Sequence, residues 1–281
     1  MFTEPWAMTG PTPGRDLTAA PDDHIAAADA AAQAGRLLVE LRHNLTADGS
    51  GAEALRRQGD RRSNDLLADI LSSRFPDDAI LSEEAADHPA RLGHSRVWIV
   101  DPLDGTREFG ELGRVDWAVH VALVVDGAPA AGAVCLPARG ITMSTAPRPR
   151  PRPQRHGPVR MLVSRTRPAG FVAALAERLD ATVVPMGSAG AKAMAVVLGE
   201  GEIFVHAGGQ YEWDTAAPVA VATAAGLHAS RIDGSPLRYN QPVPWLPDLL
   251  ICTQELASPA LAALSELAHG EAAAGPSGER R

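Results

Sequence analysis

The sequence predicts an α/β protein made of two halves, an α+β half over residues 21–145 and an α/β half over residues 159–269. In the first half, two long segments with apolar residues at helical spacing precede strand-like runs joined by turn residues. In the second half, strand-like and helix-like runs alternate, which is typical of layered α/β folds. The cationic, proline-rich stretch 146–158 cannot form a core and is expected to be an exposed loop between the halves.

The totals limit the class of protein. The 281 residues, 45% hydrophobic and 21% charged, are enough for a sizeable core of ordinary composition. A net charge of −8 argues against broad nucleic-acid binding, although an RNA-binding role of the 146–158 loop is an alternative. There is no signal-peptide pattern and no apolar run of about 20 residues, so we expect a cytoplasmic protein with no membrane partner. Cys135 and Cys252 lie in apolar runs and are expected to be reduced and buried.

Two helices are expected after a loose tail over residues 1–20. The first follows the capping residues Asp22 and Asp23 and ends near Leu45. A loop over residues 46–54 and a second helix from about Asp60 to Arg74 come next. On spacing alone, Asp60 is the N-cap of this second helix.

The strands of the first half are short apolar runs with turn residues between them. Asp126 and Gly127 predict a hairpin between two of them. His120 lies inside one run, which favours a sheet residue over a ligand. The expected strands are Ala79–Leu81, Trp98–Val100, Trp117–Val125 and Ala130–Leu136.

The second half is predicted to alternate between strands and helices up to a loose tail over residues 270–281. The strands are expected at Val159–Val163, Ala181–Pro185, Glu202–Val205 and Leu249–Cys252. The helices are expected at Pro168–Leu179, Ala189–Leu198, Asp214–Ala225 and Ala257–His269.

The stretch D-P-L-D-G-T after the strand Trp98–Val100 carries the strongest chemical pattern. Asp101 and Asp104 lie close together, and two such anions repel unless a cation or a proton lies between them. Oxygen ligands of this kind, with the carbonyl of Leu103, suit Mg²⁺. Gly105 and Thr106 offer backbone N–H groups to a phosphate if a helix begins there. The alternative is an acidic turn with capping roles only.

Three further segments add groups of the same chemistry. Glu83 and Glu84 follow a strand, and one of them can face Asp101; the alternative is a solvated acid pair. Asp214, in E-W-D-T-A-A, is either a helix cap or another carboxylate of the site. The turn G-S-A-G-A-K contains Ser188 and Lys192, which suit a phosphate, although many helices begin after Gly-Ser.

Three motifs, S-E-E at 82–84, D-P-L-D-G-T at 101–106 and W-D-x-A-A at 213–217, occur in this order. Together they resemble the inositol monophosphatase superfamily of lithium-sensitive, Mg²⁺-dependent phosphatases, over roughly residues 23 to 268. The resemblance implies a layered α/β/α/β/α sandwich, a homodimer, and a phosphorylated small molecule as substrate.

The resemblance also implies roles for the acidic residues. Glu83 and the Leu103 carbonyl would bind a first Mg²⁺, Asp101 would bridge it to a second, and Asp104 and Asp214 would complete the second site. Thr106 and Glu83 would orient the attacking water. Asp60 corresponds to an acid assigned to a third, weaker metal or as a base. The chain has R-R-Q-G before Asp60 where the family has a Thr-containing lead, so this role stays open.

Within the superfamily, D-G-T-R-E-F resembles the branch that hydrolyses 3′-phosphoadenosine 5′-phosphate to AMP. Inositol phosphatases usually have Asn at the position of Glu108, and a basic residue at Arg107 is more typical of the nucleotide branch. The implied substrate-binding residues are Gly105, Thr106, Arg107, Ser188, Lys192 and Asp214. His206, Gln210 and Tyr211 are candidates to line the pocket. The alternatives are an inositol- or sugar-phosphate phosphatase and a non-catalytic Mg²⁺- or nucleotide-binding regulator.

Overall fold

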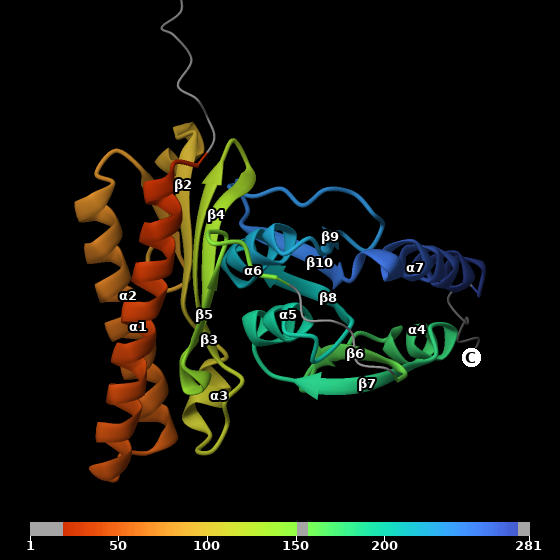
Figure 1. Ribbon diagram of the computed structural model, residues 1–281, viewed down its shortest axis with the longest axis horizontal. Helices are drawn as coiled ribbons and strands as arrows, with labels where there is room; N and C mark the ends of the chain where they lie inside the picture. Colours follow the sequence, from red (N-terminus) through yellow and green to blue (C-terminus); the bar gives the residue numbers. More distant parts are fainter. Residues whose placement is uncertain (1–18, 151–156, 275–281) are drawn as a thin grey trace, which may run out of the picture.

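The computed structural model describes residues 19–150 and 157–274, and these form five alternating layers (Figure 1). Two long helices cover one outer face, two helices fill the middle between the two sheets, and two helices cover the other outer face. In layer order these pairs are α1 (Pro21–Ala47) and α2 (Ala52–Arg74), α5 (Ala189–Val197) and α6 (Glu212–Ala224), and α4 (Val172–Arg178) and α7 (Gln254–Ala274). This is the predicted α/β/α/β/α sandwich.

The first sheet has the strand order β1-β2-β3-β4-β5 within the described residues. The first two strands pair in parallel, and the other neighbours are antiparallel. Asp126 and Gly127 both have positive φ, as a two-residue hairpin turn between β3 and β4 requires, so the predicted hairpin is confirmed. The strands are β1 (Ala79–Ser82), β2 (Arg96–Asp104), β3 (Ala118–Val125), β4 (Ala128–Leu136) and β5 (Ile141–Ser144).

The alternation of side chains along β2 decides what faces the middle layer. Val97 and Ile99 pack in the core between the two sheets, whereas Trp98 and Val100 pack against α1 and α2. Asp101 continues this period of two and therefore faces the middle layer. Pro102 has no N–H to donate, and the pairing of β2 with β3 shifts register between Asp101 and Asp104. The irregularity brings both aspartates to one side of the sheet.

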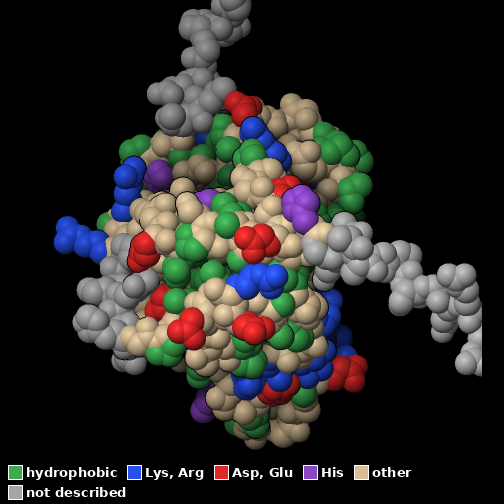
Figure 2. Space-filling view, turned by 90° about the vertical axis from the view of Figure 1, so that its right-hand side faces the viewer, with side chains coloured by type: hydrophobic (Ala, Val, Ile, Leu, Met, Phe, Trp, Pro, Cys, Tyr) green, Lys and Arg blue, Asp and Glu red, His purple; other side chains and the backbone are tan. Residues whose placement is uncertain are grey.

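The second sheet has the order β7-β6-β8-β10-β9 within the described residues. β6, β7 and β8 run parallel, so the loops after their carboxyl ends lie at one edge, where α/β proteins commonly bind ligands. The face at the α4 and α7 end carries acidic and basic side chains interspersed with apolar ones, as a solvent-facing surface does (Figure 2). The strands are β6 (Val159–Ser164), β7 (Ala181–Met186), β8 (Ile203–Tyr211), β9 (His228–Ser230) and β10 (Trp245–Cys252).

The second helix is longer than the sequence predicted. It begins after Gly51, so the loop predicted over residues 46–54 ends earlier and Asp60 lies inside α2 rather than at its N-cap. Gly59 looked like a helix boundary, but it packs tightly against Leu103 and Phe109, where an added Cβ would approach side-chain carbons at 2.8 and 2.9 Å. Close packing therefore outweighs the weak helix propensity of this glycine.

Other boundaries differ as well. β2 continues to Asp104 instead of ending at Val100, α4 begins at Val172 rather than Pro168, and α7 continues to Ala274 beyond the predicted end at His269. The short strands β5 and β9 were not predicted. Cys135 and Cys252 are free and buried, as predicted. None of the described helices is long and apolar enough to cross a membrane. The tail and loop predictions for residues 1–18, 151–156 and 275–281 lie outside the described residues.

Candidate active site

Three aspartates from two layers meet at the edge of the first sheet. Asp101 and Asp104 come from the end of β2, and Asp214 comes from the first turn of α6, so that one carboxylate oxygen of each lies within 4.8 Å of the others. Asp101 is 1% exposed and Asp104 is 7% exposed. Such a set of buried oxygen ligands can bind a metal, and its chemistry suits a hard divalent cation.

The electrostatics of the cluster also fit a cation. Burial and the negative charges of Glu83 and Asp104 raise the pKa of Asp101 well above its usual range. Burial and the charge of Asp104 raise the pKa of Asp214 to about 6. Without a cation, the cluster holds protons that a carboxylate in water would lose; a bound divalent ion would remove that repulsion.

Glu83 and Leu103 lie beside this cluster. The Glu83 backbone N–H donates to the carbonyl of Val100 at 3.4 Å, which keeps the segment after β1 against β2. Glu83 is exposed as a residue, but desolvation of its carboxyl and the charge of Asp214 raise its pKa to about 7. The Leu103 N–H donates to Asp101 Oδ1 at 3.0 Å, and the Leu103 carbonyl accepts from Thr106 Oγ1 at 3.0 Å.

Asp104 differs from its neighbours because it is surrounded by donors. It accepts from the Ser188 hydroxyl and from the Gly190 N–H at 2.7 Å, and its Oδ2 lies 3.1 Å from His120 Nε2. Burial opposes its ionisation, but the charge and hydrogen bond of His120, the Ser188 hydroxyl and the charge of Lys192 together lower its pKa to about 2. Asp104 is therefore held ionised.

His120 is a site residue that the sequence reading missed. It is fully buried in β3, and its Nδ1 lies 3.0 Å from the Trp213 carbonyl, next to Asp214. Burial lowers its pKa, but the charge of Asp104 outweighs this and leaves the pKa raised. The alternation Ala118, His120, Ala122 along β3, with both alanines in the central core, is the signal that places it on the side of the site.

Asp60 and Thr106 form a hydrogen-bonded pair next to the Leu103 carbonyl. Asp60 projects from α2, and the Thr106 hydroxyl lies 3.2 Å from Asp60 Oδ1. Burial and the negative charge of Glu84 raise the pKa of Asp60 to about 7. Gly105 precedes Thr106 with φ of 84°, and a side chain there would also crowd Ser188 Cβ at 3.2 Å. Asp60 therefore contacts the turn that follows β2 and does not hold the helix-capping position that its spacing suggested.

Ser188 and Lys192 lie on the turn into α5, close to Asp104. The Ser188 hydroxyl also accepts from the Ala191 N–H at 2.9 Å, so it caps α5 while it binds Asp104. Lys192 is 4% exposed, and its Nζ donates to the carbonyls of Ser188 at 2.6 Å and Gly187 at 3.3 Å. Burial lowers the pKa of Lys192 to about 8. Its ammonium group thus stabilises the turn through hydrogen bonds to two of the turn's backbone carbonyls.

A cavity of about 570 Å³ opens from Asp104 and Asp214 toward the second half of the chain. Every residue predicted from the sequence to bind substrate lines it, as do the pocket candidates His206, Gln210 and Tyr211. Arg165 and Arg167 line it too and were not predicted. They lie just after the carboxyl end of β6, in the run S-R-T-R at 164–167, and that position was the available signal.

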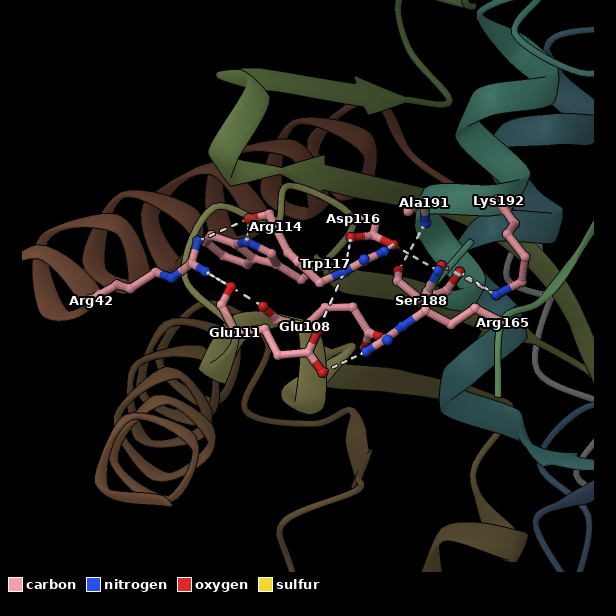
Figure 3. Close-up of polar contacts among 11 residues, drawn as sticks. Arg42, Glu108, Glu111, Arg114, Asp116, Trp117, Arg165, Ser188, Ala191 and Lys192 are labelled. Atoms are coloured by element: carbon pink, nitrogen blue, oxygen red, sulfur yellow. Dashed lines mark hydrogen bonds and ion pairs between the residues drawn. The ribbon is translucent and has the colours of Figure 1, made fainter. Parts of the chain in front are cut away.

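Glu108, the residue that distinguished the nucleotide branch, binds an arginine from the other half of the chain. Arg165 donates through Nε to Glu108 and through Nη2 to Glu111 at 2.7 Å. Arg42 of α1 donates to the backbone carbonyls of Glu111 at 2.6 Å and Arg114 at 3.0 Å. Figure 3 shows the segment after Thr106 held between these two arginines.

A network of charged side chains lies at the start of α6, the helix that carries Asp214. Glu212 is fully buried at the start of α6 and accepts from the backbone N–H groups of Asn240 at 2.7 Å and Gln241 at 2.8 Å. Arg91, 2% exposed, donates to the Asn240 side chain at 2.7 Å and to Asp87 at 2.7 Å. The network therefore connects the segment after Glu83 with the helix that carries Asp214.

Comparison with known proteins agrees with this geometry. The model of the inositol monophosphatase family matches residues 21–150 and 158–269. The chain belongs to the inositol monophosphatase family.

Several relatives within the family resemble the chain over most of its length. The chain is 46% identical over 265 residues to the 3′-phosphoadenosine 5′-phosphate phosphatase of Mycobacterium leprae, covering 90% of this chain and 97% of the relative. It is 49% identical over 244 residues to the protein of that name from Mycobacterium bovis, covering 83% and 90%. The crystal structure of CysQ from Bacteroides thetaiotaomicron has a TM-score of 0.71 at 24% identity, covering 83% and 97%, which supports the fold.

Proposed function

We propose that this chain is a Mg²⁺-dependent phosphatase that removes the 3′-phosphate of 3′-phosphoadenosine 5′-phosphate, giving AMP and phosphate. The observation that carries the proposal is the cluster of two buried aspartates, Asp101 and Asp104, with the partly buried Asp214 at one end of a cavity large enough for a nucleotide. The relatives named for this activity align over at least 90% of their own length, which supports the same substrate.

The metal ligands in this proposal are Glu83, Asp101, the Leu103 carbonyl, Asp104 and Asp214. Their oxygen atoms and the raised pKa values of three of the carboxyls suit two Mg²⁺ ions, and we assign Asp60 to a third ion on the resemblance to the family. Bound Mg²⁺ supplies charge neutralisation at the phosphate and acidity for the attacking water. Lithium sensitivity is expected from the family.

Thr106 and Asp60 are placed to manage the proton of the attacking water. The Thr106 hydroxyl lies between the Leu103 carbonyl and Asp60 Oδ1, so its orientation is restricted. Asp60, with a pKa of about 7, can accept a proton near neutral pH. Glu83 has a similar pKa, and the charges of Asp214 and Asp104 act on it, so we assign it to help orient the water.

The remaining wall of the cavity is assigned to the substrate. Gly105, Thr106 and Ser188 lie beside Asp104 and are placed at the phosphate to be removed. Arg107 directly follows Thr106, and Lys192 donates hydrogen bonds to the turn that contains Ser188. Both residues therefore place positive charge near this phosphate. Because phosphoryl transfer depends mainly on positioning and charge neutralisation, these groups are sufficient without a covalent nucleophile.

A substrate comparison tests the proposal. Phosphate release is measured from 3′-phosphoadenosine 5′-phosphate and from inositol 1-phosphate at fixed Mg²⁺, with lithium titrated in parallel. A kcat/KM preference of about a hundredfold for the nucleotide, about 2.7 kcal/mol of differential binding, is expected. Equal rates or a preference for inositol 1-phosphate would overturn the substrate assignment. Hydrolysis that persists in excess chelator would overturn the metal assignment.

We also infer a homodimer in the cytoplasm, on the resemblance to the family alone. Light scattering coupled to size exclusion tests the oligomeric state, since a dimer would have about twice the 29.4 kDa mass of one chain.

A further inference from the structure

We propose that Arg167 is the specificity-determining residue that binds the second phosphate of the substrate, the one that is not hydrolysed. This inference rests on the proposed function, because it assumes a substrate with two phosphates. It goes beyond that function by assigning the second phosphate to a residue of the second half of the chain.

The position of Arg167 separates it from the acidic cluster. It lines the main cavity and also a second cavity of about 360 Å³. The two cavities have Arg167, His206 and Gly209 in common. The second cavity is bordered by residues 167–171 and 206–209, and no Asp or Glu is among these lining residues. Arg167 therefore lies where the cavity leads away from Asp104 and Asp214.

The other cations of the main cavity are already engaged or lie elsewhere. Arg165 donates to both Glu108 and Glu111, so two carboxylates compensate its charge (Figure 3). Lys192 is buried and donates to two carbonyls. Arg107 follows the Gly105–Thr106 turn and belongs to the acidic end. An anion at the far end would thus find Arg167 as its available cationic partner.

Arg167 has a free guanidinium group on an anchored backbone. Its side chain has no carboxylate or hydrogen-bond partner among residues 19–150 and 157–274. Its backbone N–H donates to the Ser164 hydroxyl at 3.1 Å, and the N–H of Arg165 donates to the Met186 carbonyl at 3.2 Å. A fixed turn that presents an unpaired arginine into a cavity suits a phosphate, which arginine can bind through two parallel hydrogen bonds.

The proposal explains how one cavity selects a substrate with two anionic groups. The acidic end requires cations before it can accept a phosphate, whereas Arg167 carries its positive charge permanently. A ligand with a single phosphate can satisfy one end only. A bisphosphate of suitable length satisfies both, and the second contact adds to binding without touching the reacting atoms.

Steady-state kinetics on two matched substrates test this assignment. The wild type, Arg167→Ala and Arg167→Lys are compared on 3′-phosphoadenosine 5′-phosphate and on adenosine 3′-phosphate, which lacks only the 5′-phosphate. We expect Arg167→Ala to raise KM for the bisphosphate about tenfold, as for loss of a charge-assisted contact, and to leave KM for the monophosphate within about twofold. Arg167→Lys should recover part of the loss. The control is Arg178→Ala, which removes an arginine of α4 that lines neither cavity.

A parallel change on both substrates, or no change on either, would overturn the proposal. Calorimetric titration of AMP into the wild type and Arg167→Ala gives a readout that needs no turnover, and an unchanged AMP affinity would also overturn it. If the wild type hydrolyses neither substrate, the proposed function fails, while the AMP titration still decides the role of Arg167. An equal melting temperature for all variants ensures that folding is not the cause.

Discussion

The two ends of the cavity carry opposite charge and are built in different ways. The acidic end consists of carboxylates fixed by a strand and a helix, buried, and crowded enough that their pKa values move in both directions. The basic end consists of an exposed arginine on a turn after β6, with no carboxylate beside it among the described residues. In the proposed function the acidic end therefore needs cations to work, whereas the basic end is ready to bind an anion.

The two ends therefore have different effects on the stability of the fold. Burying like charges at the acidic end destabilises the metal-free protein, and the surrounding network has to hold them in place. The basic end adds no such cost because its side chain stays hydrated. Changes at the acidic end should therefore alter chemistry and stability together, and changes at the basic end should alter substrate preference alone.

The largest expected effect comes from Asp104→Asn. The variant loses the carboxylate that is held ionised at a pKa of about 2 and that we propose as a metal ligand. We expect kcat to fall at least about a thousandfold, equivalent to about 4 kcal/mol in the barrier. Steady-state phosphate release at saturating Mg²⁺ measures this, with the exposed Asp69→Asn as the control. Turnover near that of the wild type would remove Asp104 from the metal site.

The next effect concerns the support behind the acidic end. Glu212→Ala leaves the N–H groups of Asn240 and Gln241 without their acceptor and removes one of the two negative charges near Arg91, which keeps Asp87. Breaking a buried network of this kind should lower the free energy of unfolding by about 3 kcal/mol, measured by urea denaturation. Glu212→Gln keeps one acceptor oxygen and should lose less. Equal stability of all three proteins would show that the network does not hold the acidic end.

A smaller effect is expected at the turn between the two ends. Lys192→Met keeps the length of the side chain but removes the donor to the Gly187 and Ser188 carbonyls and the positive charge near Asp104. We expect KM for the bisphosphate to rise about tenfold, about 1.4 kcal/mol. An unchanged KM would mean that Lys192 neither positions the turn nor attracts the phosphate.

The smallest effect is a pH dependence of the metal-free protein. Glu83 and Asp60 have pKa values of about 7 and Asp214 of about 6, all above their ordinary values, so the folded state holds these protons more tightly than the unfolded chain does. Stability should therefore be greatest below about pH 4 for these groups and fall as pH rises toward 7. In chelator, we expect the melting temperature to drop by a few degrees, roughly 3–5 °C, between pH 5 and 7.5.

Addition of Mg²⁺ at pH 7.5 should restore the lost melting temperature, because binding to the folded state stabilises it. Glu83→Gln should flatten the pH dependence in chelator. A melting temperature that rises with pH in the absence of metal would contradict the raised pKa values of the cluster.

The sequence was most informative where local pattern and local structure agree. The D-P-L-D-G-T stretch placed two aspartates and the Gly105–Thr106 turn together because they are close in the chain, and the proline that disturbs the pairing of β2 is visible in it. Asp214 could be assigned to the same site because its motif, W-D-x-A-A, follows the other two in the order that the family has. Spacing alone suggested a cap at Asp60 because Gly59 imitates a helix boundary, whereas the resemblance assigned Asp60 to the site. The packing of Gly59 against Leu103 and Phe109 explains the continuous helix.

Contacts between the two halves could not be read from the sequence. The pairing of Glu108 with Arg165 joins residues 57 positions apart, and Asp104 meets Ser188 across 84 positions. Their proximity depends on how the two sheets pack around α5 and α6. The same is true of Arg167, whose turn faces the site only because β6 runs parallel to its neighbours β7 and β8.

The identity of the product shows directly which phosphate of the substrate lies at the acidic end of the cavity. If the acidic end acts on the 3′-phosphate while the basic end holds the 5′-phosphate, hydrolysis of 3′-phosphoadenosine 5′-phosphate must give AMP. Phosphorus NMR of the reaction mixture, with both adenosine monophosphates as standards, distinguishes the two possible products. We expect AMP and inorganic phosphate with Mg²⁺ present and no reaction in chelator. Adenosine 3′-phosphate as the main product would contradict it, because the substrate would then bind in the opposite direction.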